Sequence, residues 1–222
     1  MNSVIVFARY PEAGKVKTRL SKTLGDEFAA GLYRRMAEQI FSNCLTLPRE
    51  INDLHLFYDN ENYNDSIKKW VPSEFSLHLQ EGADLGEKMK NAFGLMFNNR
   101  YEKVIIIGTD CPGINSNFIL RSFLELSQHD ITIGPSNDGG YYLVGMNKFY
   151  PFLFDRIEWG KERVLNKTIN IIKKNKLKLF MLPELIDIDT EQDLRKWMSL
   201  TDDKNEINAF IDSYGIKLNA SG

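Results

Sequence analysis

The sequence has few of the residues from which cross-linked or zinc-centred folds are built. Only Cys44 and Cys111 are cysteines, so the chain can form neither a disulfide framework nor a cysteine-rich zinc cluster. Its three histidines, His55, His78 and His129, are scattered without the spacing of metal ligands. We therefore expect these histidines at strand ends or on the surface, and not in a metal site.

Long hydrophobic runs and an excess of one charge are also missing. The N-terminal apolar run Val4–Ala8 is too short for the core of a signal peptide, and no later stretch approaches a membrane span. The formal net charge is −2, so no global basic field favours nucleic acid. We expect a cytoplasmic protein that binds neither membranes nor nucleic acid.

The chain does contain an ordinary globular composition, in which short β-branched runs alternate with longer helical periods. Hydrophobic residues make up 43% and charged residues 26% of the 222 residues, which argues against a disordered chain. The predicted strands are Ser3–Ala8, Leu54–Tyr58, Phe75–Leu79, Val104–Ile107, Asp130–Ile133, Tyr141–Met146 and Lys178–Leu182. The predicted helices are Glu27–Leu45, Asp65–Val71, Leu85–Phe97, Asn117–Ser127, Glu162–Lys174, Glu191–Ser199 and Lys204–Tyr214.

This alternation predicts the fold class. Strands separated by helices imply right-handed crossovers and a mostly parallel sheet with helices on both faces. The length would permit two small domains, but no linker divides the chain. We expect one three-layer α/β/α domain that spans residues 1–222.

The first candidate site is the basic loop that follows the first predicted strand. In open parallel sheets, ligands bind beyond the carboxyl ends of the strands. Gly14 marks the loop, and its basic residues are Lys15, Lys17 and Arg19. Exposed backbone N–H groups, ammonium groups and guanidinium groups complement phosphate oxygens. A solvated basic loop is the alternative, but the position after a strand favours a phosphate site.

Three aspartates are candidate metal ligands. Asp110 follows the buried strand Val104–Ile107, where a carboxylate can hold Mg²⁺ together with substrate phosphates. Asp187 and Asp189 stand two apart in an extended segment, so their side chains share a face and repel unless a cation or proton lies between them. Two of the three have a structural alternative, which is the cap of a turn or of the next helix for Asp110 and a helix cap for Asp189.

A glycine-rich stretch between two predicted strands is the last candidate. Gly139 and Gly140 let the backbone approach a ligand closely, and Asp138 can accept a hydrogen bond from a hydroxyl or an amine. Asp-Gly is also a strong hairpin signal. A binding loop and an ordinary hairpin turn therefore stay open as alternatives.

Together these segments resemble a known family. The resemblance rests on Phe7–Pro11, Lys17–Leu20, Gln80–Met89, Gly108–Pro112, Gly134–Leu143 and Asp187–Thr190, in that order along the chain. They are similar to the bacterial DUF2064-type proteins, which are glycosyltransferase-like members of the nucleotide-diphospho-sugar transferase superfamily. That family is close to the molybdenum-cofactor and 2-phospholactate nucleotidyltransferases.

The resemblance implies a glycosyltransferase-A-type sheet and roles for the candidate residues. It implies that Asp110 binds Mg²⁺ or Mn²⁺ and that Asp187 and Asp189 meet the same ion or a second one. The positions that it implies for binding the donor and the acceptor are Lys15, Thr18, Gln80, Gly82, Gly139, Gly140 and Tyr141. Of these, Gln80 and Gly82 would line a base or ribose pocket.

The predicted function is a Mg²⁺-dependent transferase with a nucleotide donor and a small-molecule acceptor. In glycosyl transfer, Lys17 and Arg19 would neutralise the leaving phosphates of an NDP-sugar, and Asp138 would be the base for the acceptor hydroxyl. The alternative is nucleotidyl transfer, in which the acceptor attacks an NTP and pyrophosphate leaves. A second alternative is a protein that binds a nucleotide without turnover.

Overall fold

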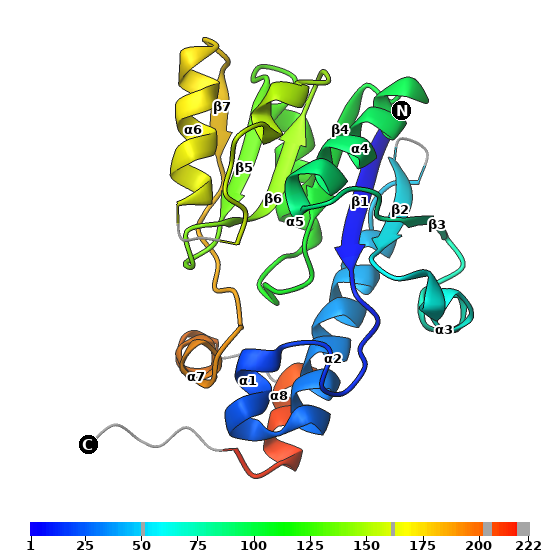
Figure 1. The fold of residues 1–222 in the computed structure, drawn as a ribbon, viewed down its shortest axis with the longest axis vertical. Helices are drawn as coiled ribbons and strands as arrows, with labels where there is room; N and C mark the ends of the chain where they lie inside the picture. The colour runs from blue at the N-terminus through cyan, green and yellow to red at the C-terminus, as the bar shows by residue number, and fades with distance from the viewer. Residues whose placement is uncertain (50–51, 161–162, 202–205, 217–222) are drawn as a thin grey trace.

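Seven strands form one sheet in the order β3-β2-β1-β4-β6-β5-β7 (Figure 1). The structure is a computed structural model that describes residues 1–49, 52–160, 163–201 and 206–216. The strands are β1 (Asn2–Ala8), β2 (Asn52–Tyr58), β3 (Phe75–Leu79), β4 (Lys103–Ile107), β5 (Ile131–Pro135), β6 (Tyr141–Met146) and β7 (Leu179–Met181). β6 runs antiparallel to both of its neighbours, and the other pairs are parallel. The prediction of a mostly parallel α/β sheet is confirmed.

The helices agree with the apolar periods of the sequence except at one place. They are α1 (Thr18–Leu24), α2 (Asp26–Leu45), α3 (Asn64–Trp70), α4 (Leu85–Asn98), α5 (Ser116–Glu125), α6 (Val164–Lys174), α7 (Glu191–Leu200) and α8 (Glu206–Ser213), with short 3-10 turns η1 (Glu61–Tyr63) and η2 (Pro151–Phe154). The predicted first residues of two helices, Glu162 and Lys204, lie outside the described residues. Helix α1 was not predicted, because Leu20 is its only buried residue and no apolar period marks it.

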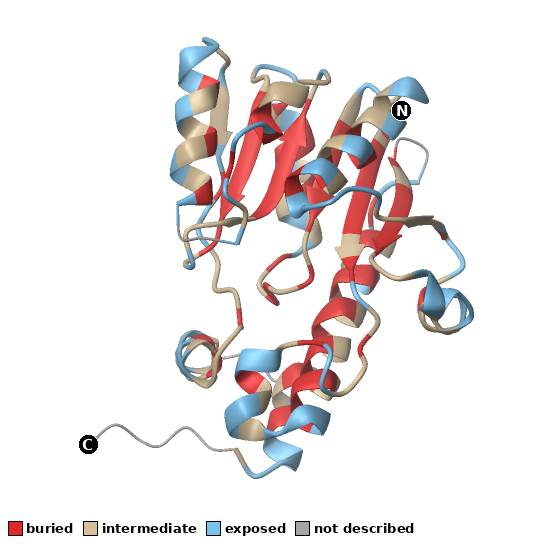
Figure 2. Ribbon diagram, in the orientation of Figure 1, coloured by how far each residue is buried: buried red, intermediate tan, exposed pale blue. Residues whose placement is uncertain are grey.

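Three apolar clusters hold the layers together. Along β1, Val4 packs with α2 and α5 on one face of the sheet, and Ile5 packs with α4 on the other, as the period of two along a strand requires. A third cluster joins α1, α2, α7 and α8 beyond the sheet and includes Leu20, Leu194 and Ile211. Figure 2 shows the strands buried and the helices exposed on their outer sides.

The third cluster places helices at the carboxyl end of the parallel strands. In Figure 1 the arrow of β1 points toward the end of the molecule at which α1, α7 and α8 lie. The loops that follow β1 and β4 therefore face the start of α7. None of the helices in the described ranges is both long and apolar enough to cross a membrane.

Candidate active site

Lys17 is buried at the start of α1, although it lies in a loop rich in charge. Its backbone is left-handed, with φ of 47° and ψ of 44°, and it is the N-cap residue of α1. Only 5% of its side chain is exposed. A lysine that is buried to this degree needs an anionic partner, so its surroundings identify the site.

Two of the predicted acids meet at the Lys17 ammonium. Lys17 Nζ lies 2.6 Å from Asp110 Oδ1 and 3.4 Å from Asp187 Oδ1. The sequence placed a cation or a proton between Asp187 and Asp189, whereas the structure places Lys17 between Asp110 and Asp187. We call these three residues the lysine–aspartate cluster.

Asp189 has a different cationic partner. Its Oδ2 lies 2.9 Å from Arg19 Nη1 of α1. The residue that caps α7 is Thr190, whose hydroxyl accepts from the backbone N–H of Asp193 in a capping box. The open question of whether Asp189 serves only as a helix cap is thereby answered, because Thr190 fills that position.

Two backbone contacts hold the acid-bearing segment in place. The N–H of Ile188 donates to the carbonyl oxygen of Asp110 at 3.0 Å. The N–H of Asp187 donates to Asn137 Oδ1 at 2.8 Å. The segment thus runs between the loop after β4 and the turn between β5 and β6. This arrangement brings Asp110 and Asp187 to one point, although they are far apart in the chain.

Tyr33 of α2 links the loop that follows β1 to the loop that follows β4. Its hydroxyl accepts from the backbone N–H of Arg9 and shares a hydrogen bond with the Thr109 hydroxyl, both at 2.8 Å. Burial raises the pKa of this phenol to about 12, with a further contribution from Asp110, so it stays neutral. Tyr33 and Asn137 were not predicted as site residues, because nothing in the local sequence distinguishes them from core or turn residues.

The charged groups of the cluster shift one another's pKa values. Burial lowers the pKa of the Lys17 ammonium, but Asp110 and Asp187 outweigh this effect and raise it above its usual value. Burial raises the pKa of the Asp187 carboxyl to about 7; Lys17 opposes this shift, and Asp110 and Asp138 add to it. Lys17 therefore stays charged, and Asp187 changes its charge near neutral pH.

The glycine-rich stretch forms the turn of an antiparallel hairpin between β5 and β6, so this alternative of the sequence analysis holds for the backbone. Asp138 Oδ1 accepts from the Ser136 hydroxyl at 2.5 Å and from the N–H of Gly140 at 2.9 Å. The carbonyl of Gly139 accepts from the N–H of Leu165, at the start of α6. The Tyr141 ring packs in the apolar cluster on the α4 face, with its hydroxyl oxygen buried.

Within the part of the chain that the structure describes, the remaining predicted positions make no hydrogen bond or ion pair with the side chains of the cluster. Lys15 is exposed, and Thr18 is the first residue of α1. Gln80 donates from Nε2 to the carbonyl of Phe57 at the end of β2. Gly82 has φ of 144°, and a Cβ there would lie 2.7 Å from a backbone nitrogen of α4, so only glycine fits. Their roles in binding stay predictions.

The acids fit a divalent cation only in part. Asp110 and Asp187 already converge on one positive charge, and carboxylate oxygens are the ligands that Mg²⁺ takes together with substrate phosphates. In the ranges that the structure describes, no group of three or more acidic, histidine or cysteine side chains could hold a metal. The pair fits a metal that substrate phosphates complete, and the predicted three-acid set is not assembled because Asp189 faces Arg19.

The buried thiol next to the cluster takes no part in its chemistry. Cys111 is 1% exposed. Burial raises the pKa of this thiol well above its usual value, and the carboxylates of Asp187 and Asp110 add to the shift. A thiolate nucleophile is therefore excluded at this position.

The chain is similar to proteins of one bacterial family. The family model described as "Uncharacterized protein conserved in bacteria (DUF2064)" matches residues 44–161, which is more than half of the chain. A crystal structure of a candidate nucleotide-diphospho-sugar transferase from Desulfovibrio desulfuricans G20 is 32% identical, with a TM-score of 0.90. The match covers 96% of this chain and 95% of that one. None of the curated proteins matches the chain.

More distant structures share the fold. The 4-diphosphocytidyl-2C-methyl-D-erythritol synthase from Anaerococcus prevotii is 11% identical with a TM-score of 0.60, over 90% of this chain and 95% of that one. A cytidylyltransferase from Leptospira borgpetersenii is 14% identical with a TM-score of 0.56, over 96% and 93%. At these identities the likeness concerns the fold alone. The family match and the 32% identical structure confirm the resemblance that the motifs indicated, and the chain belongs to the DUF2064 family.

Proposed function

We propose that the chain is a transferase with a nucleotide donor, and that it moves a glycosyl group from an NDP-sugar to a small acceptor. The observation that carries this proposal is the buried Lys17 ammonium between Asp110 and Asp187 at the carboxyl ends of the strands. Ligands of open parallel sheets bind at that edge. The similarity to the D. desulfuricans protein, which is named for this donor class, supports the same choice.

The charge of the site supports a metal requirement. Among the residues that the structure describes, the carboxylates of Asp110, Asp187 and Asp189 pair with two cations, Lys17 and Arg19. A donor diphosphate would therefore meet a negative site when all three acids are ionised. A Mg²⁺ or Mn²⁺ ion held by Asp110 and Asp187 would supply the positive charge that neutralises the donor phosphates.

The side chains of the site have distinct tasks in this reaction. The bond between the anomeric carbon and the donor phosphate breaks, the nucleoside diphosphate leaves, and the anomeric carbon bonds to the acceptor oxygen. Lys17 and Arg19 stabilise the charge on the leaving phosphate. The acceptor proton passes to Asp138 Oδ2, since Ser136 and Gly140 occupy Oδ1 and orient the carboxylate.

One observation favours nucleotidyl transfer as the second candidate. The loop before α1 carries a third cation, Lys15, which is exposed and whose ammonium has no partner among the described residues. A triphosphate brings more charge than a diphosphate, and a third cation would complement it. In that reaction an acceptor oxygen attacks the α-phosphorus and pyrophosphate leaves.

Calorimetric titration tests the proposal. Wild type would be titrated with UDP-, GDP-, ADP- and dTDP-sugars and with NTPs, each with and without Mg²⁺. The site variant is Asp110→Asn, and the matched control is Asp65→Asn, which makes the same charge change at an exposed position of α3. We expect one NDP-sugar to bind only with Mg²⁺, and the Asp110 variant to lose that binding while the control keeps it.

The other outcomes are equally definite. Tight binding of an NTP in place of an NDP-sugar would support nucleotidyl transfer. Mg²⁺-dependent binding without release of nucleoside diphosphate in the presence of any acceptor tried would support the non-catalytic alternative. Equal binding by the wild type and the Asp110 variant would refute the assignment of Asp110.

A further inference from the structure

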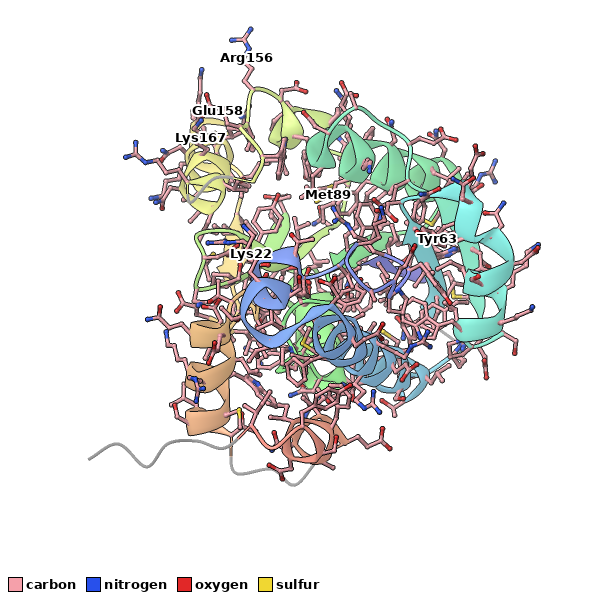
Figure 3. The ribbon with its side chains drawn as sticks, turned by 60° about the horizontal axis from the view of Figure 1, so that its bottom comes forward. Lys22, Tyr63, Met89, Arg156, Glu158 and Lys167 are labelled. Atoms are coloured by element: carbon pink, nitrogen blue, oxygen red, sulfur yellow. The ribbon has the colours of Figure 1, made fainter. Side chains whose placement is uncertain are left out.

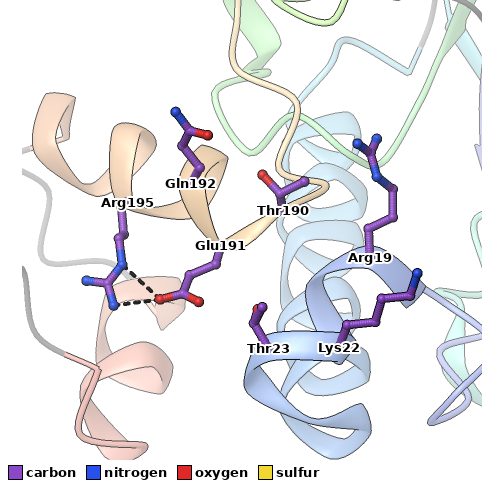
Figure 4. Close-up of a pocket in the computed structure, with 7 residues that line it drawn as sticks. All are labelled: Arg19, Lys22, Thr23, Thr190, Glu191, Gln192 and Arg195. Carbon is purple, nitrogen blue, oxygen red and sulfur yellow. Dashed lines mark hydrogen bonds and ion pairs between the residues drawn. The ribbon is translucent and has the colours of Figure 1, made fainter.

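A pocket lies next to the lysine–aspartate cluster, between α1 and the start of α7. Its volume is about 620 Å³, which is in the range of small-molecule sites. Figure 4 shows its walls, and Figure 3 labels Lys22 at the end of the molecule where α1 lies. The lining residues are Arg19, Lys22, Thr23, Thr190, Glu191, Gln192 and Arg195. Arg19 is common to the pocket and the cluster, because its guanidinium pairs with Asp189.

The pocket is basic, although the whole chain has a slight negative charge. Three of its seven lining residues are cations, and Glu191 is the only acid among them. Glu191 is already paired, since its Oε1 accepts from Arg195 Nε at 2.9 Å and from Nη2 at 2.7 Å. After the Glu191–Arg195 and Arg19–Asp189 pairs are counted, the charge of Lys22 is left among the described lining residues.

Two side chains at the pocket are free to bind a ligand. Across the ranges that the structure describes, neither the Lys22 ammonium nor the Gln192 amide has a hydrogen-bond or ion-pair partner. They come from opposite walls, Lys22 from α1 and Gln192 from α7 (Figure 4). In Figure 4 the Lys22 ammonium points away from α7 and the Gln192 amide points away from α1, so both side chains would turn inward to meet a ligand. An ammonium and an amide are donors of the kind that a phosphate group accepts from.

We propose that this pocket binds the phosphate group of a phosphorylated acceptor. The inference rests on the proposed function, because it takes the donor phosphates to lie at the lysine–aspartate cluster. Arg19 lines the pocket and pairs with Asp189, two residues after Asp187, so the pocket adjoins the cluster. The acceptor thus carries an oxygen at one end for the reaction and a phosphate at the other for recognition.

A matched set of probes tests the class of ligand. Glycerol 3-phosphate, glycerate and glycerol carry a phosphate, a carboxylate and no charge on nearly the same skeleton. Binding to the full chain would be followed by NMR shift perturbation at low salt and again at 0.5 M NaCl, where surface electrostatics are screened. We expect glycerol 3-phosphate to bind best, and its binding to weaken with salt.

Three variants of one residue locate the binding. Lys22→Ala should weaken glycerol 3-phosphate binding by about fivefold, Lys22→Glu by at least about tenfold, and Lys22→Arg should retain it. The control is Lys69→Ala, which removes an exposed lysine from α3. Affinity for the nucleotide donor should stay within about twofold of wild type in all four proteins, because Lys22 is outside the donor site.

Several results would overturn the proposal. These are equal binding of glycerol 3-phosphate and glycerol, stronger binding of glycerate, or no effect of the Lys22 variants. A parallel loss of nucleotide affinity in Lys22→Glu would show that the pocket holds donor phosphates instead. If no nucleotide binds but glycerol 3-phosphate still depends on Lys22, the proposed function fails and the phosphate pocket stands.

Discussion

Replacement of Lys17 by methionine should destabilise the protein in a pH-dependent way. Methionine keeps the apolar stem of the side chain and removes its terminal ammonium. Removal of one partner from a buried ion pair costs about 3 to 5 kcal/mol, because the remaining charge stays buried without compensation. The Asp110 side chain is 43% exposed and recovers some hydration. We therefore expect a loss of about 2 to 3 kcal/mol at pH 8.

The pH dependence follows from the Asp187 carboxyl. Its folded-state pKa of about 7 is higher than the ordinary value of 3.8, so the folded protein takes up an extra proton between these values. The contribution of the Asp187 carboxyl to the free energy of unfolding is therefore present at low pH and is lost as the pH rises through 7. At pH 5, Asp187 is neutral in both proteins, and the variant loses only the pair with the half-exposed Asp110, about 1 kcal/mol.

Urea unfolding of the wild type and of Lys17→Met at pH 5 and pH 8 measures the loss of unfolding free energy at each pH. Lys69→Met on α3 is the control for loss of an exposed charge. A Lys17→Met/Asp187→Asn double variant should recover part of the loss at pH 8, since it removes the unpaired carboxylate as well. If the Lys17 variant unfolds within about 0.5 kcal/mol of wild type at pH 8, or loses the same amount at both pH values, the reasoning is refuted.

Three further predictions concern the rest of the fold. Burial, with a contribution from His78, lowers the pKa of His55 to about 4, so its stability contribution is present above pH 6.5 and is lost as the pH falls toward 4. In urea unfolding, the wild type should lose roughly 3 kcal/mol of unfolding free energy across that pH range, and His55→Gln should not. An equal pH dependence of the unfolding free energy in the two proteins would contradict this. Thr190→Ala removes the cap of α7 and should cost about 1 kcal/mol in thermal unfolding, whereas Thr190→Ser should not; equal melting of both would argue against the capping box. Gly86→Ala would place a Cβ 2.1 Å from Trp159 Nε1, so we expect a shift in tryptophan emission and a loss of about 1 to 3 kcal/mol, and unchanged emission would disprove the contact.

The sheet could be predicted from the sequence because its strands are covered on both faces. Val104–Ile107 has no polar position, and burial of β4 on both sides explains why. Helix α1 could not be predicted in this way, because Leu20 alone of its residues is buried. Its formation depends on the third apolar cluster, which unites helices from both ends of the chain.

The position of the site was predictable, and the pairing of its side chains was not. The rule that ligands bind after parallel strands led to Lys17, Asp110 and Asp187, which do meet. The rule is silent on which cation separates the acids, because that depends on the left-handed backbone of Lys17. Local spacing also could not decide between Asp189 and Thr190 as the cap of α7.

The contact between Lys17 and Asp187 joins positions that are 170 residues apart. Closing so long a loop costs entropy before the contact repays it, so this pair is expected to form late in folding. A chain that is still being synthesised holds Lys17 and Asp110 but cannot complete the cluster until the segment before α7 has docked. The site therefore forms only when the segment that carries Asp187 is present. A protein truncated before residue 187 can keep most of its sheet and still have no site.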